Sequence, residues 1–382
     1  MDSAFAKKFE ILNLLKNDYL NRNLLTNVTP MTFTFLVTNR CNLKCKHCYH
    51  ENDSNGSSRQ ELDLDEYDKL SKSIGYFPSA YFGGGEPFVR KDFSNIVNTL
   101  RKNSNISWVS ITTNGTQTDS IVQQTEEILF NSKGKTCVLN FSLDGFEKEH
   151  SATRGIGVYE KCFKSIRAVS KFREKYDNFS IGIVSTMTTI NEANLSEFFT
   201  YIANELSPNI ISLLYARQVP RGGKELQNIK LENYARAAKK LEQLFCEGKI
   251  GNLASPTSYF PLAYYDIILK TLSSGNRCFL CYAGVYSACI DFDGEINGCE
   301  VFCDSKYNRN ILSMGNVREY NYDFNKLWNS EQAQLVRSQV NRRYCCNNCT
   351  HETEGILPSI YFEPNFEFVK RSINRVNSIT KV

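Results

Sequence analysis

The chain has 382 residues, of which 41% are hydrophobic and 23% are charged, a composition typical of a soluble globular protein of about two domains. Its net charge of +4 is small for this length and no block of Lys and Arg stands out, so nucleic acid is not an expected partner. No apolar stretch approaches the length of a membrane span and the first residues lack a signal peptide, which predicts a cytoplasmic protein.

A leading helix and then six strand–helix units are predicted in chain order. Apolar residues at helical spacing predict the leading helix over residues 4–25. The predicted strands are Thr32–Val37, Ala80–Phe82, Trp108–Thr112, Val138–Leu143, Ser180–Met187 and Ile210–Tyr215. The predicted helices that follow them are Asp63–Gly75, Asp92–Lys102, Asp119–Phe130, Tyr159–Lys175, Glu192–Glu205 and Leu231–Phe245. This alternation indicates an α/β protein with parallel strands, and six units predict a partial (β/α)6 TIM-like barrel with an open side.

The sequence changes character near residue 276, where cysteine, glycine and short apolar runs become frequent. Asp293-Gly294 predicts a hairpin turn between strands at Val285–Ile290 and Glu295–Gly298, and a helix is expected over Phe324–Val340. These features predict a small C-terminal α+β domain. The expected boundaries are an N-terminal helix at 1–30, the barrel at 31–225, a helical linker at 226–275, the C-terminal domain at 276–355 and a tail at 356–382.

The fourteen cysteines fall into two groups, six before position 250 and eight between positions 278 and 349. In a cytosolic chain such cysteines are metal ligands or reactive thiols more often than disulfides. Cys41, Cys45 and Cys48 follow the first strand with the spacing C-x3-C-x2-C. Three thiolates on one loop can hold three irons of a [4Fe–4S] cluster and leave the fourth iron open. The alternative is a zinc site completed by His47 or His50.

Glycine-rich and polar motifs follow the next three strands. They are Gly83–Pro87 after the second strand, Thr113–Gly115 after the third and Ser142–Gly145 at the end of the fourth. Because the C-terminal ends of parallel barrel strands meet on one face, we expect these motifs to lie beside the cysteine loop.

With these motifs in this order, the sequence resembles the radical S-adenosylmethionine (radical SAM) superfamily, whose signature is C-x3-C-x2-C. The resemblance implies that Cys41, Cys45 and Cys48 hold a [4Fe–4S] cluster whose open iron binds S-adenosylmethionine (SAM). It also implies one-electron cleavage of SAM to a 5′-deoxyadenosyl radical, which abstracts a hydrogen atom from the substrate. A flavodoxin- or ferredoxin-like protein is the expected electron donor.

The resemblance further implies contacts to SAM. Glu86 would accept hydrogen bonds from its ammonium group, and Gly84 and Gly85 would let the backbone approach its methionine moiety; a solvated glutamate paired with Arg90 or Lys91 is the alternative for Glu86. The other implied contacts are Ser142 and Asp144 to the ribose or carboxylate, Asn114 as a further polar contact, Arg154 to the carboxylate, and Tyr49 near the adenine. For the last two, a surface arginine and a core tyrosine are the alternatives.

A second metal site is predicted in the C-terminal domain from Cys281, Cys299, Cys346 and Cys349, because four thiolates complete a closed [4Fe–4S] site. The spacing resembles the auxiliary-cluster extensions called SPASM and twitch. The shorter twitch form with one auxiliary cluster is favoured, because Gly355 stands where the longer form has its next cysteine. A structural zinc ribbon is the alternative.

Several other residues have open roles. The spare cysteines are either small buried hydrophobic residues or a substitute ligand or hydrogen-atom donor; they are Cys278, Cys289, Cys303 and Cys345. Tyr215 and Arg217 end the sixth strand on the expected catalytic face and are candidate substrate contacts. His351 is expected to be a surface residue and not a ligand.

The predicted function is oxidation of a small-molecule or sugar-like substrate, with the auxiliary cluster accepting an electron. Too few residues precede the first strand for a leader-binding domain, which favours a small molecule over a peptide. The alternatives are a peptide maturase that forms a cross-link or an epimer, and a non-catalytic iron–sulfur or zinc-binding assembly protein. The substrate itself is not predictable from the fold.

Overall fold

A computed structural model describes residues 29–50, 60–132, 134–303, 313–340, 347–362 and 367–380. The leading helix predicted over residues 4–25 lies outside these residues, as do Cys345 and Cys346. No helix in these ranges is long and apolar enough to cross a membrane.

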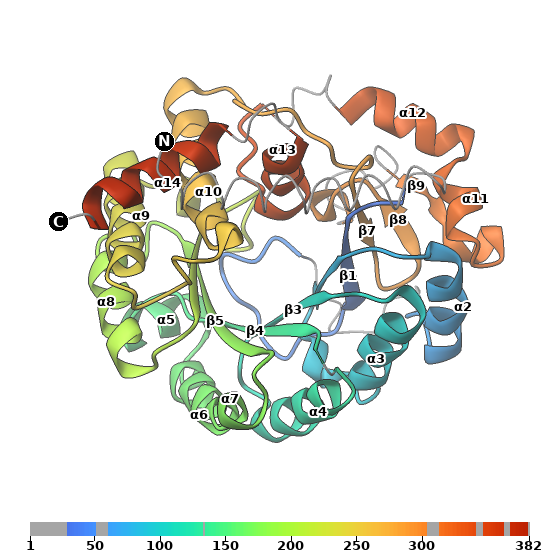
Figure 1. Cartoon of the computed structure of the whole chain (residues 1–382), viewed down its shortest axis with the longest axis horizontal. Helices are drawn as coiled ribbons and strands as arrows, with labels where there is room; N and C mark the ends of the chain where they lie inside the picture. Colours follow the sequence, from blue (N-terminus) through green and yellow to red (C-terminus); the bar gives the residue numbers. More distant parts are fainter. Residues whose placement is uncertain are drawn as a thin grey trace.

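Six parallel strands form the centre of the molecule and confirm the predicted partial barrel. They are β1 (Thr32–Thr38), β2 (Ser79–Gly84), β3 (Trp108–Thr113), β4 (Thr136–Ser142), β5 (Phe179–Met187) and β6 (Ile210–Tyr215). All seven residues of β1 are buried, as expected for a parallel strand covered on both faces. Figure 1 shows the strands curving around an interior with helices on the outside.

The outer helices follow the strands along the chain. They are α2 (Leu64–Ile74), α3 (Phe93–Ser104), α4 (Thr118–Phe130), α5 (Glu147–Arg154), α6 (Val158–Ser170), α7 (Phe172–Lys175), α8 (Leu195–Glu205) and α9 (Leu231–Cys246). Asp63 caps α2: its carboxylate accepts a hydrogen bond from the backbone N–H of Glu66 (2.8 Å), whose side chain accepts one from Asp63 N–H (2.9 Å). This reciprocal capping box explains why α2 begins where it does.

The C-terminal extension continues the barrel sheet. β7 (Ser287–Ile290) pairs in parallel with β1, and β8 (Glu295–Asn297) and β9 (Ser313–Asn316) follow it in antiparallel order. The nine strands are arranged β6-β5-β4-β3-β2-β1-β7-β8-β9, so β6 and β9 are the two edges. The barrel is therefore open, and the extension is built onto the strand that leads into the cysteine loop.

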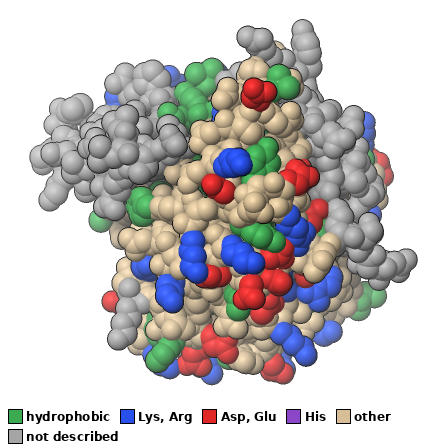
Figure 2. Space-filling model, turned by 90° about the vertical axis from the view of Figure 1, so that its right-hand side faces the viewer, with side chains coloured by type: hydrophobic (Ala, Val, Ile, Leu, Met, Phe, Trp, Pro, Cys, Tyr) green, Lys and Arg blue, Asp and Glu red, His purple; other side chains and the backbone are tan. Residues whose placement is uncertain are grey.

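Further helices complete the molecule around this sheet. The helix predicted over Phe324–Val340 is interrupted at Asn329-Ser330 and forms two helices, α11 (Phe324–Trp328) and α12 (Glu331–Val340). α11 packs on α2, and α12 packs on β9. α10 (Phe260–Ser274) packs on α9, α13 (Leu357–Phe362) and α14 (Glu367–Thr380), and Figure 1 shows α9, α10 and α14 grouped on one side. On the face drawn in Figure 2, Lys and Arg side chains are interspersed with Asp and Glu.

Candidate active site

A cavity of about 220 Å³ opens at the C-terminal ends of the strands. It is lined by residues from every predicted motif of the barrel; those predicted as ligands or contacts are Cys41, Cys45, Cys48, Tyr49, Gly84, Gly85, Glu86, Asn114, Ser142, Arg154, Tyr215 and Arg217. Among the predicted contacts to SAM, Asp144 does not line it. Residues more than 170 positions apart in the sequence therefore meet in one cavity, as expected for loops at one end of a barrel.

The cysteine loop places three thiols on the cavity wall. Burial raises the pKa of Cys41 to about 11, and it also raises the pKa of Cys45. Without a cation these thiols stay protonated, whereas a bound metal would hold them as thiolates. The donor set thus fits an iron–sulfur cluster with three protein ligands.

Gly84 and Gly85 allow the end of β2 to approach the cysteine loop. A Cβ atom at Gly84 would lie 2.5 Å from the carbonyl oxygen of Thr38, and one at Gly85 would lie 2.1 Å from that of Arg40. The backbone N–H of Gly85 donates to Thr38 O (2.7 Å), and that of Glu86 donates to Arg40 O (2.9 Å). The sequence analysis explained Gly84 and Gly85 by a close approach of the backbone to SAM. In the structure, the absence of a side chain at these two positions makes room for the backbone of Thr38 and Arg40.

Glu86 is fully buried on the cavity wall, with 1% of its surface exposed. Its carboxylate accepts hydrogen bonds from Thr113 Oγ1 (2.7 Å), Asn114 N–H (2.6 Å) and Phe88 N–H (3.3 Å). Burial outweighs these hydrogen bonds and raises its pKa to about 7. Arg90 pairs with Asp92 instead (2.8 Å), so Glu86 is not the solvated, ion-paired glutamate of the alternative prediction.

Asp144 has a different position from the predicted one. Its carboxylate is fully buried and accepts from Arg154 Nε (2.6 Å) and from the backbone N–H of Thr186 (2.9 Å). Burial alone would raise the pKa of Asp144, but the positive charge of Arg154 outweighs it and lowers the pKa to about 2. The ionised Asp144 therefore holds Arg154 in place, and Arg154 is the member of the pair that faces the cavity.

His47 is a cavity residue to which the sequence assigned only a zinc-ligand role. Its Nε2 lies 3.4 Å from Arg154 Nη2 and its Nδ1 lies 3.6 Å from Asp144 Oδ2. Burial lowers the pKa of His47 to about 4, so the ring is neutral at pH 7. Its position two residues from Cys45 in a metal-ligand loop was the only signal in the sequence.

The C-terminal extension brings three of its four predicted ligands together. Cys281 and Cys299 are buried and Cys349 is partly buried, and their thiols are close enough to interact electrostatically. Burial raises the pKa of all three thiols, as at the first site. Cys346, the fourth predicted ligand, lies outside the described residues.

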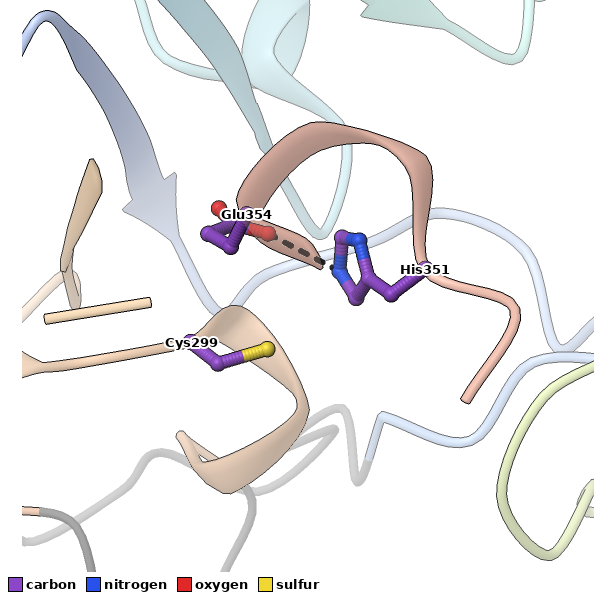
Figure 3. Close-up of side chains that lie close together, drawn as sticks. All are labelled: Cys299, His351 and Glu354. Atoms are coloured by element: carbon purple, nitrogen blue, oxygen red, sulfur yellow. Dashed lines mark ion pairs between the residues drawn. The ribbon is translucent and has the colours of Figure 1, made fainter. Parts of the chain in front are cut away.

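His351 is not a surface residue, contrary to the prediction, because only 2% of it is exposed. Figure 3 shows its ring pointing toward Glu354, with Cys299 beside them. His351 Nε2 lies 2.9 Å from Glu354 Oε2 and 2.9 Å from Glu300 Oε1, and the ligand atoms of Cys299, His351 and Glu354 lie within 4.8 Å of one another. Burial and Arg217 would lower the pKa of His351, but the two carboxylates outweigh them and raise it.

Glu300 joins this group to the cavity. Its Oε1 also accepts from Tyr49 Oη (3.0 Å) and from Arg217 Nη1 (3.3 Å), and Glu300 itself lines the cavity. The sequence analysis missed Glu300, although its place directly after the predicted ligand Cys299 was a signal. The hydrogen bond between Tyr49 and Glu300 therefore connects the residue after Cys48 with the residue after Cys299.

The spare cysteines in the described part of the chain do not line the cavity. Cys289 and Cys303 are buried with their Sγ atoms 3.4 Å apart, and Cys278 Sγ lies 3.4 Å from Thr271 Oγ1. No disulfide joins any two of the twelve cysteines within the described ranges. Cys289 and Cys303 therefore pack as small buried residues, and Cys278 is partly buried against the core.

A family model described as "Radical SAM superfamily" matches residues 35–202, the segment that supplies most of the cavity. The chain belongs to the radical SAM superfamily. A second model, "Iron-sulfur cluster-binding domain" (SPASM), matches residues 281–350. This radical SAM chain is thus an enzyme of the SPASM/twitch subgroup, with SAM, a [4Fe–4S] cluster and auxiliary iron–sulfur as cofactors, and not the non-catalytic assembly protein of the alternative prediction.

The relatives of this radical SAM enzyme act in different reactions. It is 24% identical over 339 residues to the tungsten-containing aldehyde ferredoxin oxidoreductase cofactor-modifying protein of Pyrococcus furiosus, which covers 84% of this chain and 86% of that protein. It is 26% identical over 347 residues to pre-heme d1 synthase of Dinoroseobacter shibae, with coverage of 83% and 78%. The solved structure of anSMEcpe with bound AdoMet has a TM-score of 0.60 at 18% identity, with coverage of 91% and 96%, which shows the shared fold.

Proposed function

We propose that this enzyme removes two electrons from a small-molecule or sugar-like substrate and that its auxiliary cluster accepts one of them. When bound, the cofactors supply a 5′-deoxyadenosyl radical for hydrogen abstraction and an acceptor for the electron left on the substrate. One observation carries the proposal: Glu300, directly after the auxiliary ligand Cys299, lines the same cavity as the three cysteines of the first site. A substrate in the cavity would thus lie between the two sites.

The proposed contacts to SAM lie on the barrel side of the cavity. Glu86 offers a carboxylate to the ammonium group, and Arg154, held by Asp144, offers a guanidinium to the carboxylate. Asn114, Ser142 and Tyr49 are also on the wall, and we propose that they contact the ribose and adenine. Gly84 and Gly85 belong to the same wall through their backbone.

We propose that Arg217 and Glu300 bind the polar groups of the substrate. Arg217 is 12% exposed, its Nη1 donates to Glu300, its Nη2 forms an ion pair with Glu352, and its buried Nε has no hydrogen-bond partner in the described part of the chain. An unsatisfied buried donor is costly, and a substrate hydroxyl or carboxylate would satisfy it. This pair suits an alcohol-bearing substrate better than an apolar one.

The redox-neutral alternative of epimerisation requires a thiol that returns hydrogen within the cavity. Among the described residues, the cavity wall carries no cysteine other than the three cluster ligands. The name of the heme d1 relative supports a small-molecule substrate. The anSMEcpe complex with a peptide shows that this fold accommodates a peptide, so peptides belong in the substrate screen.

The division of labour between the sites is tested with three cysteine variants, purified and reconstituted anaerobically. Cys41→Ala should abolish 5′-deoxyadenosine formation, because the first cluster loses a ligand. Cys349→Ala should retain cleavage of SAM in the absence of substrate within about threefold of wild type but lose oxidised product by more than about tenfold. Cys246→Ala, at the end of α9 and away from both sites, is the matched control and should keep both activities and full iron content. Equal loss of SAM cleavage in the Cys41 and Cys349 variants would contradict the proposal.

The substrate is sought by the rise in 5′-deoxyadenosine that a true substrate causes. A panel of polyols, amino sugars, tetrapyrroles and short peptides is compared, and mass spectrometry should detect a product two hydrogens lighter. A product of unchanged mass that incorporates one solvent deuterium would instead establish epimerisation.

A further inference from the structure

The guanidinium of Arg154 lies next to one of the three cluster ligands as well as on the cavity wall. Its Nη1 lies 3.9 Å from Cys45 Sγ, within the range of a hydrogen bond to sulfur, and only 8% of the arginine side chain is exposed. Cys45 is buried too. A charged donor therefore meets a ligand sulfur at a place where little water screens the interaction.

Two neighbours hold the other side of this guanidinium. Its Nε donates to Asp144 Oδ2 (2.6 Å), and its Nη2 lies 3.4 Å from Asp144 Oδ1 and 3.4 Å from His47 Nε2. Asp144 is fixed in turn by the backbone N–H of Thr186 (2.9 Å). Because Nε and Nη2 are directed at these two residues, Nη1 is the nitrogen that remains for Cys45 and for a ligand in the cavity.

The surroundings of Cys45 differ from those of Cys41. Burial raises the pKa of both thiols, and at Cys45 the charge of Arg154 is the largest effect that opposes this rise. At Cys41 the largest opposing effect is a backbone hydrogen bond from Leu43, and the carboxylate of Glu86 adds to the rise. Arg154 thus favours the anionic form of one particular ligand sulfur.

We propose that Arg154, beyond its proposed contact with SAM, raises the reduction potential of the SAM-binding [4Fe–4S] cluster through an N–H···S hydrogen bond to Cys45. A charged donor withdraws electron density from a ligand thiolate, and hydrogen bonds to the sulfurs are among the effects that set the potential of such a cluster. Asp144 and His47 are positioning residues in this role, because they act through Arg154. The cluster is then easier to reduce before SAM binds.

The test is the midpoint potential of this cluster in the reconstituted enzyme without SAM, followed by electron paramagnetic resonance during a titration with dithionite. The signal of this cluster is the one that changes when SAM is added to a separate sample. In Arg154→Met, which has no donor at this position, the equilibrium constant for reduction should fall at least about tenfold, or about 60 mV for one electron. Because SAM is absent, loss of a contact to its carboxylate cannot cause this shift.

The double variant Arg154→Met/Asp144→Asn gives a second measurement that does not depend on the folding of Arg154→Met. It removes the ion pair as a whole, so no buried charge is left without its partner and the net charge near the cluster is unchanged. The equilibrium constant for reduction should still fall at least about threefold, because the donor to Cys45 is gone.

The matched control is Arg221→Met. Arg221 is an exposed cation whose guanidinium donates to the backbone oxygens of Cys45 (3.4 Å) and His50 (2.8 Å) and not to a sulfur. The equilibrium constant for reduction should stay within about twofold of wild type, because an exposed charge is screened by water.

An unchanged potential in either Arg154 variant, or an equal shift in Arg221→Met, would overturn the proposal. Weaker binding of SAM together with an unchanged potential would make Arg154 a contact to the carboxylate alone and would overturn it as well. The potential is measured without substrate, so failure here is distinct from failure of the proposed oxidation.

Discussion

Single charged side chains at the cavity wall are held in place by hydrogen bonds from or to buried neighbours. Arg154 is oriented by Asp144, and Glu86 by hydrogen bonds from Thr113 and Asn114. In both cases the charged group that faces the cavity is fixed before any ligand binds. Fixed charges in a buried site bind opposite charges with little reorganisation, which suits a zwitterionic ligand such as the methionine moiety of SAM.

Glu86 gives a prediction at this scale. Burial raises its pKa to about 7, so in the free protein it is mostly protonated below that pH, and only its ionised form pairs with an ammonium group. The affinity for SAM should therefore rise by about fivefold to tenfold between about pH 6 and about pH 7.5, measured by calorimetry on the reconstituted enzyme.

Glu86→Gln is the control, because an amide keeps the shape of the side chain but does not titrate in this range. It should weaken binding of SAM at pH 7.5 and remove most of the pH dependence. The same pH dependence in the variant would assign the titration to another group.

At the scale of elements, the sequence predicted the six barrel strands closely, because β-branched and aromatic runs alternate with amphipathic helices. Ile210–Tyr215 was predicted residue for residue, and Tyr159–Lys175 was continuous in the prediction but breaks into α6 and α7 at Lys171. β9 was not predicted, since Ser313–Asn316 contains a single apolar residue and becomes a strand only by pairing with β8. The pattern of apolar residues along the sequence therefore predicts strands and helices that bury an apolar face of their own. It misses strands, such as β9, that form because they pair with a neighbouring strand.

The same limit applied to the site. Spacing alone identified the cysteines, because metal ligands on one loop are close in the sequence. The role of Asp144 as the partner of Arg154 and the burial of His351 depend on contacts across the fold. No local pattern encodes such contacts.

Arg318 gives a prediction about how the extension is attached to the barrel. Its guanidinium donates to both carboxylate oxygens of Glu66 on α2 (2.6 and 3.0 Å), and Glu66 is 8% exposed. Arg318→Ala would leave this carboxylate buried without its cation, so the free energy of unfolding should fall by about 2–3 kcal/mol in chemical denaturation.

Arg371→Ala is the matched control, because Arg371 and Glu367 form an exposed pair one turn apart on α14. Its effect should be below about 0.5 kcal/mol. Equal destabilisation by the two variants would show that the Glu66 contact contributes no more than a surface ion pair.

Across the whole molecule, the two predicted cluster sites belong to one continuous sheet. β1 leads into the first cysteine loop and pairs with β7, and the hairpin of β7 and β8 is followed by Cys299. Tyr49, Glu300 and Arg217 add side-chain hydrogen bonds between the same two regions. The distance between the sites is therefore set by strand pairing and not by a hinge between domains.

The pairing of β1 with β7 also bears on how the extension can be separated from the barrel. A chain ending before Ser287 would leave unpaired those backbone N–H and C=O groups of Thr32–Phe35 that point toward β7, while the other edge of β1 stays paired with β2. Unprotected edges of this kind template association with other chains. We expect such a truncated protein to form β-rich aggregates, detected by light scattering and thioflavin fluorescence, while the full-length chain stays dispersed; a monomeric truncated barrel would contradict this. The C-terminal extension would then prevent the barrel from self-associating through β1, in addition to supplying the predicted cofactor ligands.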